Sequence, residues 1–356
     1  MKIHPDAAQS IQNALNACED EVVLTPGEFE ITDNLVQPFK IGGILRGSGI
    51  GPSDVHPNHM GTTSALVSMD RRSNPLLKLQ GSHFSLRDLT IFGPEVAVGI
   101  TKLRNGIGSG KHEFANLQIA EANIGFQVAE DPADNNCDVS TFNNIFLTKV
   151  GTGFLSLGHQ AMSFSVKHLV AQRTNVVADI RAGGCWYFDD VIFTKQRDLS
   201  TRPTLLRISQ TRFGSRGRAA MGSSNARFEI RNLKTDNQLK SWTIVNMTNE
   251  SPAVITLIGG RVRHSPNAVI RGNGSLYISD YSYLGPKLIE WHDRKGKRTP
   301  SFTLVNSFVS RSVKDPKDLL SPLSSGKCNV RIENNFIYPS GERLADLKEV
   351  VNALEV

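Results

Sequence analysis

The chain has 356 residues, of which 39% are hydrophobic and 21% charged, so it can bury a large core. Forty lysine and arginine residues against 34 aspartate and glutamate residues give a net charge of +6, which favours acidic partners such as nucleic acid, acidic glycans or anionic lipid. No apolar run approaches the roughly 18 residues of a membrane span, and four cysteines without a CxxC pair exclude a zinc knuckle and a dense disulfide framework.

The first predicted element is an amphipathic helix over Pro5–Cys18. Its small and apolar positions, Ala8, Ile11, Leu15 and Cys18, recur at helical spacing. We expect this helix to cover one end of the structure, and we assign residues 1–20 to the cap. The start of the chain has no basic segment followed by an apolar stretch, so no secretory signal is visible.

A short pattern then recurs ten times: an apolar alternation, a small polar residue, and a second apolar alternation, first seen in Phe84–Ile91. Asn or Asp holds eight of the ten central positions. These positions are Asp88, Asn116, Asn144, His168, Asp190, Asn232, Gly259, Asp280, Asn306 and Asn334. Successive copies are 21 to 28 residues apart, except for one gap of 42 residues that contains an insertion. A strand pattern with this period predicts a stacked solenoid.

A further strand follows most copies and usually begins at Gly, Asn or Pro, as at Gly125–Phe126 and Gly153–Phe154. Three strands per repeat, without a Leu-rich consensus or a helix in each repeat, predict a parallel β-helix whose turns stack at about 4.8 Å. We therefore expect one all-β domain of about ten coils over residues 21–338, with a basic loop inserted at about 209–226. Leu344, Leu347 and Val351 lie at helical spacing after Ser340, so we expect a second capping helix over 339–356.

Three segments carry a resemblance to a known group of proteins. Ile11–Leu15, Val22–Ile31 and Ile44–Gly49 resemble the N-terminal cap and first coils of the pectate-lyase-like β-helix superfamily. That superfamily includes pectate and pectin lyases, polygalacturonases, rhamnogalacturonases, uronan epimerases and phage tailspikes. The resemblance implies a right-handed helix, an extracellular or cell-surface location, and a monomer or homotrimer. One fold serves many chemistries, so the resemblance leaves the activity open.

The central polar positions have a structural interpretation. An Asn at the bend between two strands can hydrogen-bond to the copies above and below it, so a column of such residues joins the coils. We assign Asp88, His168, Asp190 and Asp280 to this ladder. Asp189 should point to the opposite side of its strand and is less easily explained in this way.

The resemblance also implies a substrate groove along the outer face of the strand that precedes the first turn of each coil, beside the long loops. If Val176, Ala178 and Ile180 point inward, Asp179 points outward. The equivalent outward residues on other coils are Thr101, Gln127, Arg207, Arg271 and Glu290. A solvated face with salt bridges between coils is the alternative interpretation of this column.

The spacing of the carboxylates favours one reaction class. A glycosidase needs two carboxyl groups about 5 to 9.5 Å apart. Asp179 and Glu290 are four coils apart, roughly 19 Å, and the polygalacturonase motifs are missing, so a hydrolase of that kind is disfavoured. A uronate lyase or epimerase needs a cation that neutralises the carboxylate and a base that removes the C5 proton. We assign catalysis to Asp179 and Arg207, and substrate binding to a set made up of Arg271, Glu290, Gln127 and Arg212.

Two loops bear on cofactors and partners. The acidic loop Glu130–Asp138 makes calcium possible, but it lacks the order of a dedicated calcium loop, and its ordinary interpretation is a solvent-exposed turn. The segment Arg202–Arg231, which contains Arg212, is rich in arginine and suits a lid or a contact with an anionic polymer. Its only aromatic residues are Phe213 and Phe228, which are too few for base stacking, so nucleic acid is an unlikely partner.

The sequence therefore predicts a protein that acts on an acidic, uronate-containing or sulfated polysaccharide, by a lyase or epimerase reaction. Two alternatives stay open. One is a non-catalytic glycan-binding or structural β-helix, such as a phage tail or surface adhesin component. The other is a glycoside hydrolase.

Overall fold

The computed structural model describes sixteen stretches of the chain. They are residues 7–17, 20–38, 41–51, 63–70, 75–101, 109–130, 137–158, 161–194, 203–209, 226–235, 242–247, 253–261, 269–282, 284–292, 299–321 and 327–352. The predicted basic insertion and Arg212 fall in residues 210–225, outside the described residues. None of the described helices is long and apolar enough to cross a membrane.

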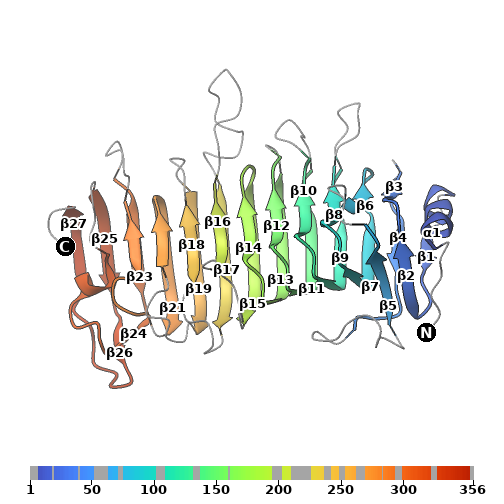
Figure 1. The fold of residues 1–356 in the computed structure, drawn as a ribbon. Coiled ribbons are helices and arrows are strands. Elements are labelled where there is room, and N and C mark those ends of the chain that lie inside the picture. The colour runs from blue at the N-terminus through green and yellow to red at the C-terminus, as the bar shows by residue number, and fades with distance from the viewer. Residues whose placement is uncertain are drawn as a thin grey trace, which may run out of the picture.

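Successive coils lie side by side along one long axis, from the N-terminal helix to the last strand (Figure 1). Ten parallel strands form one wall, which we call sheet B. They are β3 (Leu35–Gln37), β6 (Pro75–Leu79), β8 (Val96–Ile100), β10 (Ile124–Val128), β12 (Thr152–Ser156), β14 (Val176–Ile180), β16 (Thr204–Ile208), β18 (Thr243–Met247), β20 (Val269–Gly272) and β22 (Ile289–Trp291). Each pairs only with the coils before and after it, so the chain is a parallel β-helix, as predicted.

Fifteen strands form the second sheet, which we call sheet A and which bends around the rest of each coil. They are β1 (Glu21–Val23), β2 (Gly27–Ile31), β4 (Ile44–Arg46), β5 (Ser64–Ser68), β7 (Ser85–Phe92), β9 (Glu113–Ala120), β11 (Ser140–Thr148), β13 (Met162–Gln172), β15 (Gly184–Thr194), β17 (Arg227–Thr235), β19 (Ala253–Arg261), β21 (Gly274–Ser282), β23 (Ser301–Val305), β25 (Lys327–Glu333) and β27 (Leu347–Asn352). A 3₁₀ helix covers Pro316–Leu319, and β24 (Phe308–Ser310) and β26 (Phe336–Tyr338) form a small third sheet.

The bend in sheet A explains the repeated polar position. All ten central residues of the sequence pattern, from Asp88 to Asn334, have left-handed φ values between 50° and 59°. Asn, Asp and Gly tolerate this conformation best, which is why they dominate there. The side chains also form the predicted ladder: Asn116 donates to Asp88 and Asn144 donates to Asn116, each at 2.8 Å.

Aromatic rings fill the middle of the stack. The rings of Phe114 and Phe142 stack at 4.7 Å between centroids, and those of Phe126 and Phe154 stack at 5.2 Å. Phe126 also meets Phe142 edge to face at 4.9 Å, so the two columns interlock. Small residues are required where successive coils approach closely, because a Cβ atom on Gly153 of β12 would lie 2.6 Å from the Val177 carbonyl oxygen of β14.

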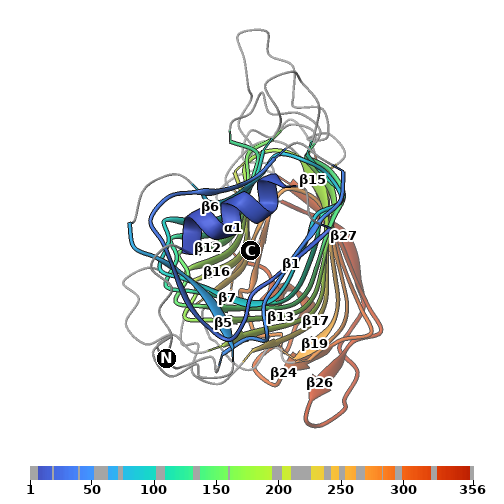
Figure 2. The same ribbon diagram turned by 90° about the vertical axis from the view of Figure 1, so that its right-hand side faces the viewer.

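The N-terminal helix is present as predicted, over α1 (Ala7–Asn16), and lies across the open end of the first coil (Figure 2). Ile11 and Leu15 are buried against the core. Gln12 completes the edge strand β3, since its side chain donates to the Val36 carbonyl at 2.8 Å and accepts from the Val36 amide at 2.7 Å. The side-chain amide thereby replaces the missing preceding strand.

The predicted C-terminal helix over residues 339–356 is wrong. Within that segment, β27 (Leu347–Asn352) is a strand that pairs antiparallel with β25. Val351 points into the core while Lys348 and Val350 are exposed. This is the alternation of a strand, which the helical spacing of Leu344, Leu347 and Val351 did not reveal. A strand is favoured here because it pairs with the backbone groups along the edge of β25, which a helix could not do.

Candidate functional site

The outward column predicted from the sequence runs along sheet B. Its residues pair directly from coil to coil, and we call them the sheet B column. They are, in order, Val36, Lys78, Gly99, Gln127, Leu155, Asp179, Arg207, Asn246, Arg271 and Glu290. Five predicted residues therefore lie in one line along the long axis, and their assigned roles stay predictions.

Two positions differ from the sequence prediction. Thr101 is not in the column: it follows the end of β8, it is 1% exposed, and Gly99 takes its place. Asn246 lies between Arg207 and Arg271 and was missed. The alternating segment around it in β18 could have revealed this coil, which lies just after the long 42-residue gap between ladder positions.

Asp179 is the most enclosed charged group of the column, with 2% of its side chain exposed. Arg181 donates to its Oδ2 atom through both Nε and Nη2 at 3.2 Å, and Ser209 Oγ donates to Oδ1 at 3.2 Å. Arg207, the predicted partner, is more distant, with Nη1 3.9 Å from Oδ2. Both carboxylate oxygens are therefore engaged by neighbouring side chains.

Sequence reasoning missed Arg181, although it follows Asp179 by two residues and so projects on the same side. Half of the Arg181 side chain and 37% of the Arg207 side chain are exposed, whereas the carboxylate between them is not. The group therefore presents two guanidinium groups to solvent over one buried negative charge. Such an arrangement can bind an anionic or hydroxyl-rich ligand through planar donors.

The other charged residues of the column are also paired. Arg271 Nε donates to Glu290 Oε2 at 2.7 Å, and Lys78 forms an ion pair with Glu130. Gln127 donates to the Ala129 carbonyl at 3.2 Å. The salt bridges between coils that the alternative interpretation expected are therefore present, and they leave a polar line along the sheet.

The carboxylate spacing matches the sequence estimate. Asp179 and Glu290 are separated by four strand spacings in sheet B, or roughly 19 Å. Across the described ranges, no group of three or more His, Cys, Asp or Glu side chains could hold a metal ion. Residues 131–136 of the acidic loop lie outside those ranges, so calcium stays a prediction.

The pair Asp189 and Asp190 belongs to the ladder side of sheet A. Asp190 contacts His168 Nδ1 at 3.0 Å and Lys234 Nζ at 3.1 Å, and these hydrogen bonds hold the pKa of Asp190 below its usual value. Asn232 donates to Asp189 at 3.1 Å and not, as expected, to Asp190. The ladder interpretation of Asp190 is therefore supported. Asp189, which we expected on the opposite side of its strand, also accepts a hydrogen bond from a ladder residue, Asn232.

A buried serine and histidine lie in contact near the N-terminal end. His112 Nδ1 accepts from the Phe84 amide at 3.3 Å, and His112 Nε2 lies 2.9 Å from Ser109 Oγ. Ser109 Oγ donates to the Leu79 carbonyl, so the hydroxyl proton is not directed at the imidazole. Burial, followed by the charge of His83, lowers the pKa of His112 to about 4. The pair thus joins core elements and is not an activated nucleophile.

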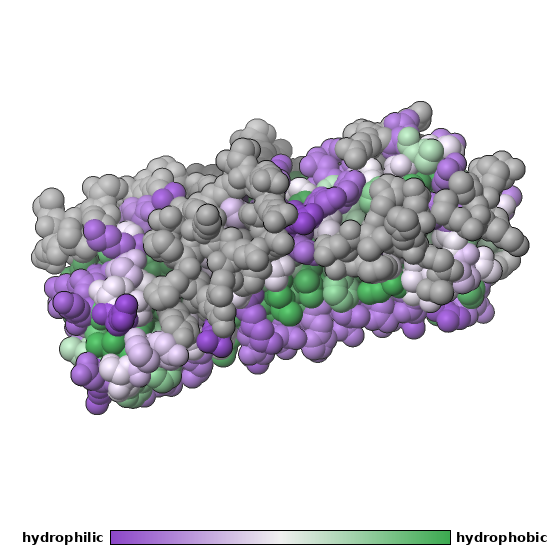
Figure 3. Space-filling view, turned by 60° about the horizontal axis from the view of Figure 1, so that its bottom comes forward, coloured by the Kyte–Doolittle hydropathy of each residue, from purple (hydrophilic) through white to green (hydrophobic). Residues whose placement is uncertain are grey.

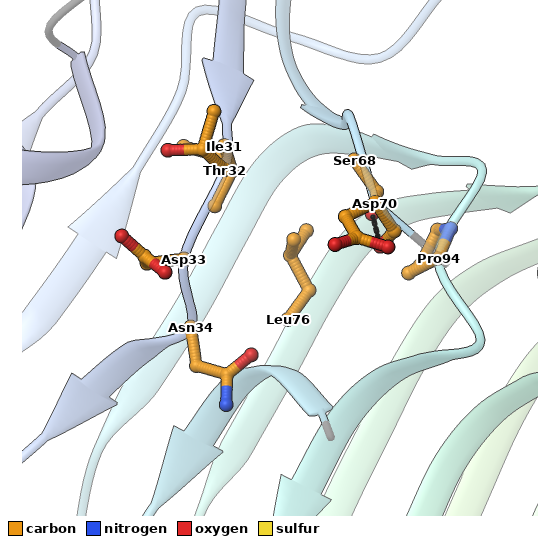
Figure 4. A pocket seen from close by; sticks show the side chains of 8 residues that line it. All are labelled: Ile31, Thr32, Asp33, Asn34, Ser68, Asp70, Leu76 and Pro94. Carbon is orange, nitrogen blue, oxygen red and sulfur yellow. Dashed lines mark hydrogen bonds between the residues drawn. The ribbon is translucent and has the colours of Figure 1, made fainter. Parts of the chain in front are cut away.

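A pocket of about 160 Å³ opens between the first coils, where β3 and β6 begin and several coils away from Asp179 (Figure 4). Asp33 and Asn34 line one side, and Ser68 and Asp70 line the other. Both aspartates are exposed, and Ser68 donates to the Asp70 carbonyl at 2.8 Å. These contacts stabilise a turn and do not form an enclosed site.

Comparisons with known proteins give structural neighbours only. No family model matches the chain, and no curated protein matches it. Two structures of the catalytic domain of GH87 alpha-1,3-glucanase in complex with tetrasaccharides match it with a TM-score of 0.50 each, at 10% and 12% identity over 96% and 93% of this chain. The chain has the pectate-lyase-like right-handed parallel β-helix fold.

The chain spans 66% and 65% of the lengths of these two glucanase domains, slightly less than two thirds. A third pectate-lyase-like neighbour is the endo-xylogalacturonan hydrolase from Aspergillus tubingensis, with a TM-score of 0.43 and 12% identity over 95% of this chain and 91% of that chain. At these identities the likeness concerns the fold, and the activity has to be argued from the site.

Proposed function

We propose that this protein acts on a polysaccharide that lies along the outer face of sheet B. From Asp179 to Glu290 the sheet B column offers five successive polar residues at one strand spacing, about 4.8 Å, which suits a linear polymer. The observation that carries the proposal is the Arg181–Asp179–Arg207 group, in which a buried carboxylate holds two half-exposed guanidinium groups in place.

The charge of this group favours an acidic polymer. Two arginines over one aspartate leave one positive charge, and guanidinium groups recognise carboxylate and sulfate oxygens in pairs. A uronate or a sulfated sugar is therefore the proposed ligand at this coil. Arg271, which is 42% exposed beside Glu290, is the proposed contact for a sugar further along the chain.

Within a lyase or epimerase reaction, the two arginines would neutralise the uronate carboxylate and so favour removal of the C5 proton. Asp179 is then a positioning residue. Its 2% exposure and its engaged oxygens do not suit a base that must reach a sugar carbon. This replaces the catalytic role that the sequence suggested for Asp179, and the catalytic base is unassigned.

Glycoside hydrolysis is the second candidate. The tetrasaccharide-bound glucanase domains of the same fold favour it. The distance of roughly 19 Å between Asp179 and Glu290 disfavours that particular pair as the two catalytic carboxyl groups. A non-catalytic glycan binder would use the same arginines without forming any product.

The test uses polygalacturonate, dextran sulfate and α-1,3-glucan as probes. Binding is measured by affinity electrophoresis, and products are measured as new reducing ends and as absorbance of unsaturated sugars. We expect Arg181→Ala and Arg207→Ala to weaken binding to the acidic probes about tenfold each. Arg231→Ala is the matched control, because Arg231 also pairs with a carboxylate two residues away, Glu229, but lies on sheet A.

Each outcome decides between the candidates. Unsaturated products would support a lyase, whereas reducing ends without unsaturated sugars would support a hydrolase. Binding without either product would support a non-catalytic binder. If both arginine variants bind all three probes as the wild type does, the proposed site is wrong.

A further inference from the structure

Two exposed aromatic side chains and one half-buried one meet at the C-terminal end of the stack. Phe308 is 40% exposed, Tyr338 is 39% exposed, and Phe336 is half-buried. The ring centroids of Phe308 and Phe336 are 5.8 Å apart with a tilt of 37°, and the ring of Tyr338 meets Phe308 at 6.5 Å and 87°. We call these three residues the aromatic platform.

The platform is built by the small sheet of β24 and β26, which projects below the coils at the C-terminal end (Figures 1 and 2). Phe308 and Phe336 are direct partners in this parallel pair, and Tyr338 follows Phe336 by two residues on the same face. Figure 3, which brings that underside forward, shows apolar surface at the C-terminal end among hydrophilic residues. The rings therefore lie outside the core that buries most aromatic residues of this chain.

Polar groups lie at the rim of the platform. Arg343 forms a bridge with Phe336 on the side away from Phe308, and its Nη2 atom donates to Asp346 Oδ2 at 2.8 Å. The exposed fractions of the two side chains are 60% and 47%, so both can contact a ligand. An exposed cluster of aromatic rings beside an arginine and a carboxylate offers apolar contact to a sugar ring and both donors and acceptors to its hydroxyls.

We propose that the aromatic platform is a second glycan-contacting site, which takes the pyranose rings of the polysaccharide bound by sheet B. The inference rests on the proposed function for the identity of the polymer, but not on the sheet B contacts. The Phe308 and Phe336 rings come from successive coils, so their spacing follows the stack, and neighbouring sugars of one chain could each pack on one ring.

The size of the platform favours a glycan over a second copy of the chain. Two paired strands of three residues each cover roughly 10 Å by 5 Å. A stable protein interface needs about 800 Å² from each partner, far more than this surface supplies. A segment of two or three sugars matches it.

The test compares the wild type with Phe308→Ala/Tyr338→Ala, which removes the two exposed rings and keeps the half-buried Phe336. Tyr187→Ala is the matched control, since Tyr187 is an aromatic residue of similar exposure, 37%, on sheet A. Retention by polygalacturonate, dextran sulfate and α-1,3-glucan is measured by affinity electrophoresis. Binding of the tetramer of the retained polymer is measured by calorimetry, and thermal unfolding shows whether each variant is folded.

We expect the platform variant to bind the retained polymer about tenfold more weakly, to bind the tetramer as the wild type does, and to unfold at the same temperature. The Tyr187 control should change none of these. Equal polymer retention by the wild type and the platform variant would overturn this inference alone. Retention of the wild type by none of the probes would overturn the proposed function as well. A wild-type dimer that the platform variant converts to a monomer in sedimentation would show that the rings contact a second copy, and would also overturn it.

Discussion

The Asp179 carboxylate and the Arg181 guanidinium form a closed contact within one coil, with Arg181 Nε and Nη2 each 3.2 Å from Asp179 Oδ2. Arg181 thus covers an outward-pointing carboxylate that alternation alone would leave in solvent. The contact changes what Asp179 can do. A residue on the groove face becomes a buried anchor, and the accessible charges are the arginines around it.

Asp179→Asn should therefore affect stability as well as binding. The substitution leaves Arg181 and Arg207 without their counter-charge, and we expect the free energy of unfolding to fall by about 1–3 kcal/mol. Binding to acidic glycans should weaken because the arginines lose their fixed positions. Urea unfolding measures the first effect, and affinity electrophoresis measures the second. Glu290→Gln is the control, since its ion pair with Arg271 is more exposed. Unchanged stability would contradict the anchoring role.

Acid should weaken the fold through His112. Its pKa is about 4 in the folded chain against about 6.5 when unfolded, so between these values the unfolded state binds more protons. Stability is therefore full above pH 6.5 and is lost as the pH falls toward 4, by about 3 kcal/mol for this group. Urea unfolding at pH 7, 5.5 and 4 should show the loss in the wild type. A His112→Gln variant should show less of it, and an identical pH dependence in both would refute the assignment.

The ladder position Asn144 tests the left-handed bend. Asn144→Ala removes the hydrogen bond to Asn116 and places an alanine at φ 56°, whereas Asn144→Gly removes only the hydrogen bond. We expect the alanine variant to be less stable than the glycine variant by about 1 kcal/mol, because of the left-handed strain. Thermal and urea unfolding of the two variants give the difference directly. The opposite order would mean that backbone entropy outweighs the strain.

Tyr281→Phe should stabilise the protein. The Tyr281 side chain is 1% exposed, and its hydroxyl has no hydrogen-bond partner among the described residues. Burial also raises the pKa of this hydroxyl, as expected for a polar group without solvent. Removing the hydroxyl should raise the free energy of unfolding by about 1 kcal/mol, seen as a higher midpoint in urea. A lower midpoint would reveal a partner for the hydroxyl.

Much of the fold could be predicted from the sequence, because each repeated residue determines the backbone conformation at its own position. Each ladder position, such as Asn116 or Asn334, has to adopt a left-handed bend, and few residue types tolerate it, so the bends mark every coil. Alternation along β14 and β16 then fixed the order of Asp179 and Arg207 along sheet B. The N-terminal helix was also predictable, since its apolar stripe has the helical period.

Three features were decided only by the tertiary structure. The chain after Ser340 contains strand β27 in place of a helix. A strand hydrogen-bonds to the backbone groups along the edge of β25, whereas a helix would leave those groups unpaired. Asp179 became buried, because Ser209 and Arg207 of the next coil approach its carboxylate together with Arg181. Phe308 met Phe336 only through the stacking of coils 28 residues apart. The sequence by itself determined where the chain bends and which residues face inward, since both depend on neighbouring residues. Which outward side chains meet depends on contacts between coils, and only the assembled stack supplies those.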